Sequence, residues 1–208
     1  MTDMTFRPLT QDQQDRLSDW RARAIQKMPY FAPILFALQP VSEPGLNTFS
    51  VDDKWRLYLD FEKASEWGDA ACGEILLHEC AHIFRDHHDR TNDYLGDKRD
   101  DAGARRIANV ANDLEINDDL VEAGCAQIAA NGQLPKHFGF KDGDAAEAYY
   151  RLLAKKAKSS CGTCGQTQPG QGSGSQNDQA QGSSDQQGSG SQPGQGSGSS
   201  SQQGSGSS

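Results

Sequence analysis

The pattern of apolar and polar residues predicts a mainly helical chain up to about residue 156. Residues 48–62, TFSVDDKWRLYLDFE, instead alternate apolar and polar side chains on both sides of Asp52-Asp53, which predicts a β-hairpin. Two or three strands followed by helices make an α+β domain. The expected helices cover residues 11–28, 69–89, 101–122 and 144–156.

The composition changes abruptly near Ser159. Gly, Ser and Gln dominate from there onwards, and no Lys or Arg follows Lys158. A segment with so little apolar surface cannot offset the entropy that it would lose on ordering. We therefore expect a folded domain over residues 5–156 and a disordered tail over residues 159–208. The Cys161-Gly-Thr-Cys164 motif has no second pair with which to form a zinc ribbon, so we interpret it as part of the tail.

Charge and cysteine usage narrow the possible functions. The 208 residues carry a formal net charge of -9, whereas a nucleic-acid or anionic-membrane surface would need a clustered basic face. No stretch is apolar enough to span a bilayer, and the first residues lack the apolar core of a secretory signal. Five cysteines without regular spacing fit reduced thiols better than a disulfide framework. We expect a cytoplasmic protein that binds neither nucleic acid nor membrane.

Four of the five histidines fall within LLHECAHIFRDHHD, residues 76–89. On a helix, His82 lies about 40° round the axis from His78, and Glu79 lies about 100° round. Zinc hydrolases use this arrangement, in which two imidazoles bind the ion and the glutamate deprotonates a bound water. The pentapeptide alone is equally compatible with a solvated helix that carries two exposed histidines. A third ligand on another element would decide between the two.

His88 is one candidate for that third ligand, because it stands ten residues after His78 as in the pattern HExxHxxGxxH. Arg85, however, occupies the place of the helix-breaking glycine in that pattern. If the helix continues unbroken, His88 points about 80° from His78 on the side away from His82. His87 then points almost directly away from the site. We expect both residues at a polar helix end and outside the site.

Asp113 is the other candidate, on the helix predicted over residues 101–122. It lies on a mixed face of that helix, with apolar residues beside it, while Glu115 points to solvent. A buried carboxylate must contact a cation or strong donors. Arg106, two turns back on the same face, offers a structural salt bridge as one alternative. We favour His78, His82 and Asp113 as metal ligands, with a water in the fourth position.

Several stretches together resemble a metallopeptidase domain of bacterial and phage proteins: LLHECAH, ANVANDLEINDDLVEAG, LPKHFGF and AAEAYYRLL, in that order, preceded by the hairpin VDDKWRLYLDFE. The resemblance covers roughly residues 20–155. Its most specific motifs are HExxH at 78–82 and A-x-D-x-x-I-N at 111–117. By position, it implies the zinc ligands His78, His82 and Asp113, a catalytic Glu79, and a fold like that of a minimal zincin.

The resemblance also bears on partners, because in that family the domain commonly precedes a von Willebrand factor A-like domain. This sequence contains no such domain, and its tail resembles the linker that would lead into one. We expect either a stand-alone version or a separately encoded partner, such as a von Willebrand factor A-like protein or an ATPase.

Two functions therefore compete. The first is a zinc-dependent endopeptidase that acts on a peptide or protein substrate held in extended form by the strand Trp55–Leu59, as a sheet edge. The second is a non-catalytic, metal-stabilised binding module that acts with a partner. The intact Glu79 favours the enzyme, because a purely structural site has no need of that carboxylate. A fourth protein ligand would favour the module.

Overall fold

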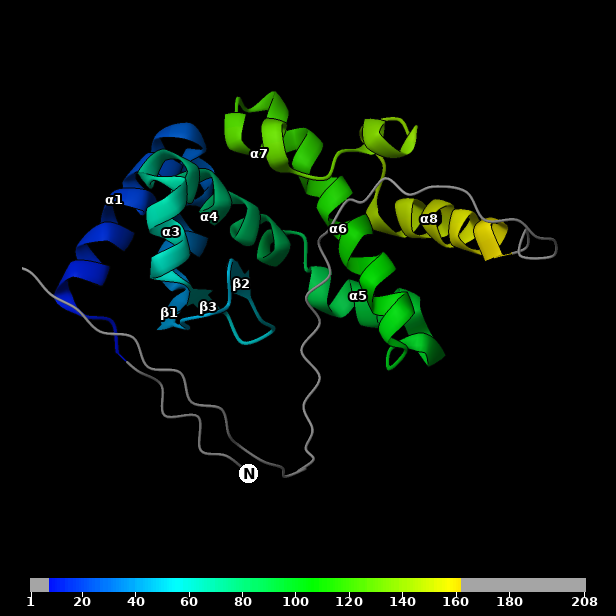
Figure 1. Ribbon diagram of the computed structural model, residues 1–208, viewed down its shortest axis with the longest axis horizontal. Helices are drawn as coiled ribbons and strands as arrows, with labels where there is room; N and C mark the ends of the chain where they lie inside the picture. Colours follow the sequence, from blue (N-terminus) through cyan, green and yellow to red (C-terminus); the bar gives the residue numbers. More distant parts are fainter. Residues whose placement is uncertain (1–7, 162–208) are drawn as a thin grey trace, which may run out of the picture. The chain divides into compact units, whose positions relative to one another are not determined.

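The computed structural model describes residues 8–161, which form a mainly helical α+β fold with a small three-stranded sheet (Figure 1). This confirms the predicted fold class. Most of the expected tail, with Cys164, lies outside the described residues. The elements are α1 (Gln11–Lys27), η1 (Pro29–Phe31), α2 (Ala32–Ala37), β1 (Gln39–Ser42), β2 (Phe49–Val51), β3 (Arg56–Leu59), α3 (Phe61–Trp67), α4 (Asp69–Phe84), α5 (His87–Leu95), η2 (Gly96–Lys98), α6 (Ala102–Glu122), α7 (Ala126–Asn131), η3 (Pro135–Phe138) and α8 (Ala146–Cys161).

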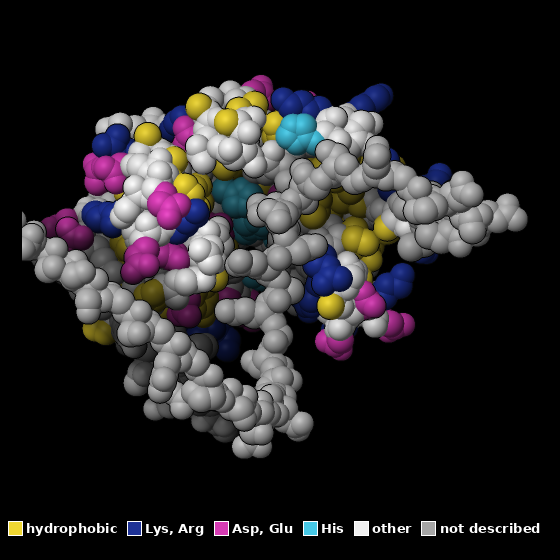
Figure 2. All heavy atoms as spheres, in the orientation of Figure 1, with side chains coloured by type: hydrophobic (Ala, Val, Ile, Leu, Met, Phe, Trp, Pro, Cys, Tyr) yellow, Lys and Arg dark blue, Asp and Glu magenta, His cyan; other side chains and the backbone are white. Residues whose placement is uncertain are grey.

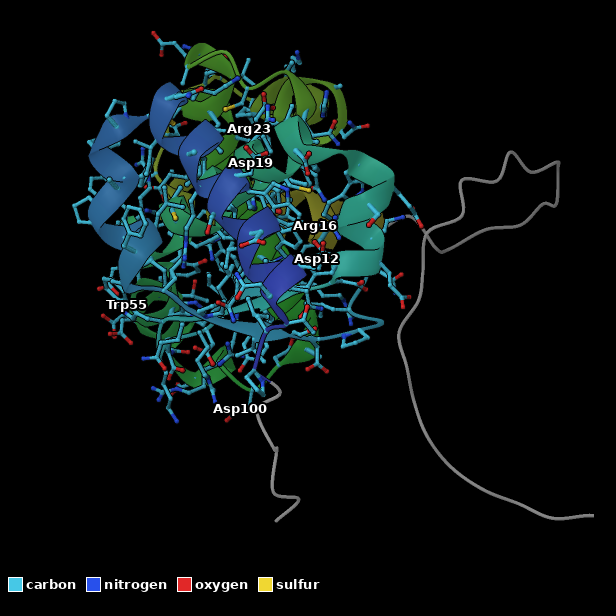
Figure 3. The ribbon with its side chains drawn as sticks, turned by 90° about the vertical axis from the view of Figure 1, so that its left-hand side faces the viewer. Asp12, Arg16, Asp19, Arg23, Trp55 and Asp100 are labelled. Atoms are coloured by element: carbon cyan, nitrogen blue, oxygen red, sulfur yellow. The ribbon has the colours of Figure 1, made fainter. Side chains whose placement is uncertain are left out.

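Helix α1 forms as its sequence predicts and packs against α4. Its buried side includes Trp20, whose indole Nε1 donates a hydrogen bond to Asp69 Oδ1 at 2.8 Å, at the start of α4. The two helices approach closely at Gly73, where an added Cβ would lie 3.3 Å from the carbonyl oxygen of Trp20. Figure 3 shows four charged side chains along the outer face of α1: Asp12, Arg16, Asp19 and Arg23.

The sheet has the strand order β1-β3-β2, in which β3 pairs in parallel with β1 and antiparallel with β2. The predicted hairpin is therefore confirmed, with Val51 opposite Leu57. The expectation that the strand Trp55–Leu59 forms a sheet edge is wrong. That strand is the central one, because residues 39–42 add a parallel strand on its other side. Strand β2, next to α4, is an outer strand instead.

Asp52 organises the hairpin turn. Its carboxylate accepts hydrogen bonds from the backbone N–H groups of Lys54 and Arg56, both at 3.0 Å, and from the Tyr58 hydroxyl at 3.0 Å. The Arg56 guanidinium also pairs with it. Trp55 adopts a left-handed backbone conformation in this turn, with φ of 61°. An Asp-Asp turn is thus stabilised by its first side chain, where an Asn-Gly turn would rely on backbone preference.

The predicted helix over residues 69–89 is two helices. Helix α4 ends at Phe84, and Asp86 takes a left-handed conformation with φ of 54° before α5 begins at His87. Aspartate is one of the few non-glycine residues that tolerate this conformation, because its short side chain can form local hydrogen bonds. The chain therefore changes direction within the histidine-rich stretch, without the glycine that usually marks such a turn.

Helix α6 contacts α4 on one side and α8 on another. Asp101 caps its first turn by accepting a hydrogen bond from the backbone N–H of Ala104, at 2.6 Å. The main core lies around α1, α4 and the sheet and includes Ile116 of α6, while Leu114 and Tyr149 belong to a second apolar cluster between α6 and α8. Helix α6 thus joins two cores. In the part of the chain described, no helix is both long and apolar enough to cross a membrane.

Replacing Asp52 by Asn should destabilise the fold by about 1–3 kcal/mol, because the turn loses charge-assisted hydrogen bonds. Burial opposes the charged form, but the hydrogen bonds from Arg56, Lys54 and Tyr58 lower the pKa of Asp52 from 3.8 to about 2. The stabilisation is therefore fully present above about pH 4 and is lost as the pH falls through 2.

Urea unfolding of Asp52→Asn and of the parent between pH 7 and pH 2 measures this difference. Asp53→Asn, a change of the neighbouring exposed residue, is the matched control and should leave stability unchanged. An Asp52 variant as stable as the parent at pH 7 would contradict this role for the carboxylate.

Candidate metal centre

Two helices bring three potential metal ligands together. Helix α4 supplies His78 and His82, one turn apart, and α6 supplies Asp113. The two Nε2 atoms lie 3.1 Å apart, and Asp113 Oδ1 lies 3.5 Å from that of His78 and 3.4 Å from that of His82. The side chains are only 13–19% exposed. Figure 2 shows histidine side chains set back in a hollow of the surface.

The three distances fit a tetrahedral ion. Ligand atoms about 2.0–2.1 Å from a tetrahedral metal lie roughly 3.3–3.4 Å from one another. The observed separations of 3.1, 3.4 and 3.5 Å scatter around that value. Two imidazole nitrogens and one carboxylate oxygen are also a donor set found in metal sites of this geometry. The residues therefore fit a bound metal in both spacing and chemistry.

The electrostatics of the three side chains favour a cation at this point. Burial would raise the pKa of Asp113, but its contacts with both histidines hold that pKa well below its usual range. Burial would lower the pKa of His78, but Asp113 raises it to about 9. Burial lowers the pKa of His82 to about 4, since the attraction of Asp113 is outweighed by burial and the repulsion from His78. At neutral pH the metal-free cluster thus holds one positive charge beside a carboxylate, and a metal ion would displace that proton.

Glu79 is buried beside His78 and faces the sheet. The Val51 backbone of β2 forms a hydrogen bond with its carboxylate. Burial is the main reason that the pKa of Glu79 rises to about 7; His78 opposes the shift and Asp113 adds to it. The outer strand of the sheet and the carboxylate of the HExxH motif therefore lie next to each other.

Asn117 fixes the orientation of His78. Its Oδ1 lies 2.9 Å from His78 Nδ1, and its Nδ2 donates a hydrogen bond to the carbonyl oxygen of Gln133 at 2.9 Å. The second contact orients the amide so that its oxygen faces the imidazole. His78 Nδ1 must then carry a proton, because it donates to that oxygen. In neutral His78, the lone pair of Nε2 therefore faces the cluster.

His82 contacts a second histidine on the opposite side of its ring. His82 Nδ1 lies 2.9 Å from His87 Nδ1, and His87 Nε2 lies 3.1 Å from Glu115 Oε2. His87 and Glu115 are both buried. The expectations that His87 points away from the site and that Glu115 faces solvent are therefore wrong. The left-handed turn at Asp86 directs His87 back beneath His82, which no continuous helix would do.

Glu115 is the centre of a buried charge network that holds the α4–α5 turn. Arg85 Nη1 donates to it at 2.9 Å and Arg90 at 3.1 Å, and the backbone N–H of Ala146, at the start of α8, donates at 2.9 Å. Burial opposes its ionisation, but His87, Arg90 and Ala146 hold the pKa of Glu115 well below its usual range. The ionised carboxylate of Glu115, on α6, thus contacts α5, the start of α8 and the residue that follows α4.

The structure also tests the two alternatives to Asp113 as a third ligand, namely His88 as that ligand and a salt bridge between Asp113 and Arg106. His88 is not among the converging ligands in the described residues, and its buried Nε2 has no hydrogen-bond partner there. Arg106 is exposed, and the ion-pair partners of Asp113 within residues 8–158 are the two histidines. The alternative of a salt bridge between Arg106 and Asp113 is therefore wrong. The structure brings Asp113 of α6 together with His78 and His82 of α4.

The sequence held a signal for only one of the supporting residues. Asn117 follows Asp113 by one helical turn, as His82 follows His78, so its presence on the same face could have indicated the contact. His87 had no such signal, because nothing near Asp86 predicts a left-handed residue.

The comparison with known families agrees with this geometry. Residues 12–207 match the family described as "Putative metallopeptidase domain". The match covers nearly the whole chain, and the chain belongs to this family. A metallopeptidase family implies a metal, and the cluster of His78, His82 and Asp113 fits one. No curated protein and no solved structure matches the chain.

Proposed function

We propose that this protein is a zinc-dependent endopeptidase whose metal is held by His78, His82 and Asp113 and whose general base is Glu79. The observation that carries the proposal is the convergence of the three donor atoms at tetrahedral spacing, with the Glu79 carboxylate beside them. The spacing and the two imidazoles favour zinc over magnesium or calcium, which prefer more oxygen ligands.

The number of ligands supports an enzyme. Among the described residues, the group that could hold a metal contains His78, His82 and Asp113 and no fourth His, Cys, Asp or Glu. Three protein ligands with an open position are typical of catalytic zinc, whereas structural zinc sites have four. The alternative of a metal-stabilised binding module with a von Willebrand factor A-like or ATPase partner would need the closed kind of site.

A zinc ion held by His78, His82 and Asp113 would supply Lewis-acid chemistry, which activates a water for attack and polarises the carbonyl of the scissile bond. Glu79 accepts the proton that the attacking water loses and returns it to the leaving amine nitrogen. Its burial keeps bulk water away from the carboxylate, and its place one residue after His78 keeps it beside the metal ligands. Asn117 holds His78 so that Nε2 faces the cluster.

The outer strand β2 gives the substrate a place to bind. An extended peptide can add to a free strand edge through backbone hydrogen bonds. Val51 of β2 contacts Glu79, so a peptide paired with β2 would pass the general base along its length. Binding of an internal stretch of chain favours cleavage within a polypeptide over removal of terminal residues.

If Asp113 is a ligand, Asp113→Ala should weaken zinc affinity by orders of magnitude, since a catalytic site has only three protein ligands. Arg106→Ala, which removes an exposed charge from the same helix, should change the affinity by less than about tenfold. Competition titration against a chelator of known affinity measures both variants. Equal affinity of the Asp113 variant and the parent would remove Asp113 from the ligand set.

Glu79→Gln should retain zinc but lose peptide hydrolysis, because an amide cannot accept the proton from the attacking water. Mass-spectrometric detection of cleavage in a diverse peptide library identifies substrates whatever sequence the enzyme prefers. Metal analysis of the same samples provides the control for zinc content. If the variant cleaves the library peptides as fast as the parent, Glu79 is not the base and the peptidase proposal fails.

A further inference from the structure

We propose that His87 is a positioning residue for the metal ligand His82, and that Glu115 holds His87 in that role. The inference rests on the proposed function, because it assumes that His82 binds metal through Nε2. The contact chain runs from His82 Nδ1 to His87 Nδ1 at 2.9 Å, and from His87 Nε2 to Glu115 Oε2 at 3.1 Å.

The direction of each hydrogen bond in the series His82–His87–Glu115 follows from the chemistry of Glu115 and of His82. Glu115 is an ionised carboxylate that also accepts from two arginines and a backbone N–H, so it can only accept from His87 Nε2. His82 must present a lone pair at Nε2 in order to bind metal, so its single proton is on Nδ1. His82 Nδ1 therefore donates to His87 Nδ1, which accepts. With its proton on Nε2, His87 donates one hydrogen bond to Glu115 and accepts one from His82, so both of its ring nitrogens have a partner.

This arrangement opposes the intrinsic preference of the ring. A neutral imidazole in water favours the tautomer with its proton on Nε2, which would block the atom that faces Asp113. The acceptor at His87 Nδ1 selects the other tautomer and fixes the plane of the His82 ring, as outer partners of metal-binding histidines commonly do. In His78, the Asn117 Oδ1 acceptor likewise selects the tautomer with its proton on Nδ1.

Asn117 and His87, the outer partners of His78 and His82, tie these two histidines to different helices. Asn117 belongs to α6, the helix that also provides Asp113. His87 lies at the start of α5, and its partner Glu115 contacts Arg90 of α5 and the first residue of α8. The orientation of His82 therefore depends on the α4–α5 turn and on the docking of α8, and not on α6 alone.

Zinc affinity of full-length variants tests the proposal. His87→Ala should weaken zinc binding about 10–100-fold, as is usual for loss of an outer partner of a metal ligand. His87→Asn should recover most of that loss, because its Oδ1 can take the place of Nδ1 as acceptor. His88→Ala removes the neighbouring histidine and should leave the affinity unchanged. Thermal unfolding of each variant without zinc shows whether it is folded.

A spectroscopic readout separates positioning from stability. In the zinc-loaded, 15N-labelled parent protein, we expect a proton on His82 Nδ1 and a scalar coupling between the Nδ1 nitrogens of His82 and His87 across their hydrogen bond. A His82 ring protonated on Nε2, or a His87 ring protonated on both nitrogens, would overturn the proposal. This measurement needs no variant to fold.

The outcomes distinguish the two proposals. A parent protein that binds no zinc ends the proposed function and, with it, the role of His87. A parent that binds zinc, together with a folded His87→Ala variant of equal affinity, overturns the positioning role alone. Weaker binding by His87→Ala that His87→Asn restores supports both.

Discussion

The carboxylate of Asp113 lies recessed between α4 and α6, where it needs a positive charge in contact. Without a metal, His78 can provide that charge, because Asp113 raises the pKa of its imidazole to about 9. The contact between these two helices therefore includes a cation site as part of its packing. The side chains of His78, His82 and Asp113 are only 13–19% exposed, and this low exposure strengthens each electrostatic interaction among them.

The polar groups around this site form successive layers. The innermost layer is the donor atoms of His78, His82 and Asp113. In the next layer, Asn117 contacts Nδ1 of His78 and His87 contacts Nδ1 of His82. Glu115 then holds His87 and is itself held by arginines on both sides of the α4–α5 turn. Each of these supporting side chains therefore has a hydrogen-bond partner, and such partners fix the orientation of the imidazoles that they contact.

Much of the fold could be predicted from sequence, because periodic apolar residues and caps determine helices such as α1 and α6 locally. The grouping of His78, His82 and Asp113 could be predicted from helical geometry and family resemblance together. The α4–α5 break could not be predicted, since nothing in the local sequence marks Asp86 as left-handed, and the contacts of Arg85 and Arg90 on either side of it are with the distant Glu115. The parallel strand β1 was missed for a related reason, because its pairing with β3 is a tertiary contact.

Anomalous diffraction on either side of the zinc absorption edge, from crystals of the zinc-loaded protein, tests the proposed site of His78, His82 and Asp113 most directly. A single zinc peak is expected about 2 Å from His78 Nε2, His82 Nε2 and Asp113 Oδ1, with no fourth protein ligand. A peak elsewhere, or one bound by His87 or His88 in place of Asp113, would contradict the account.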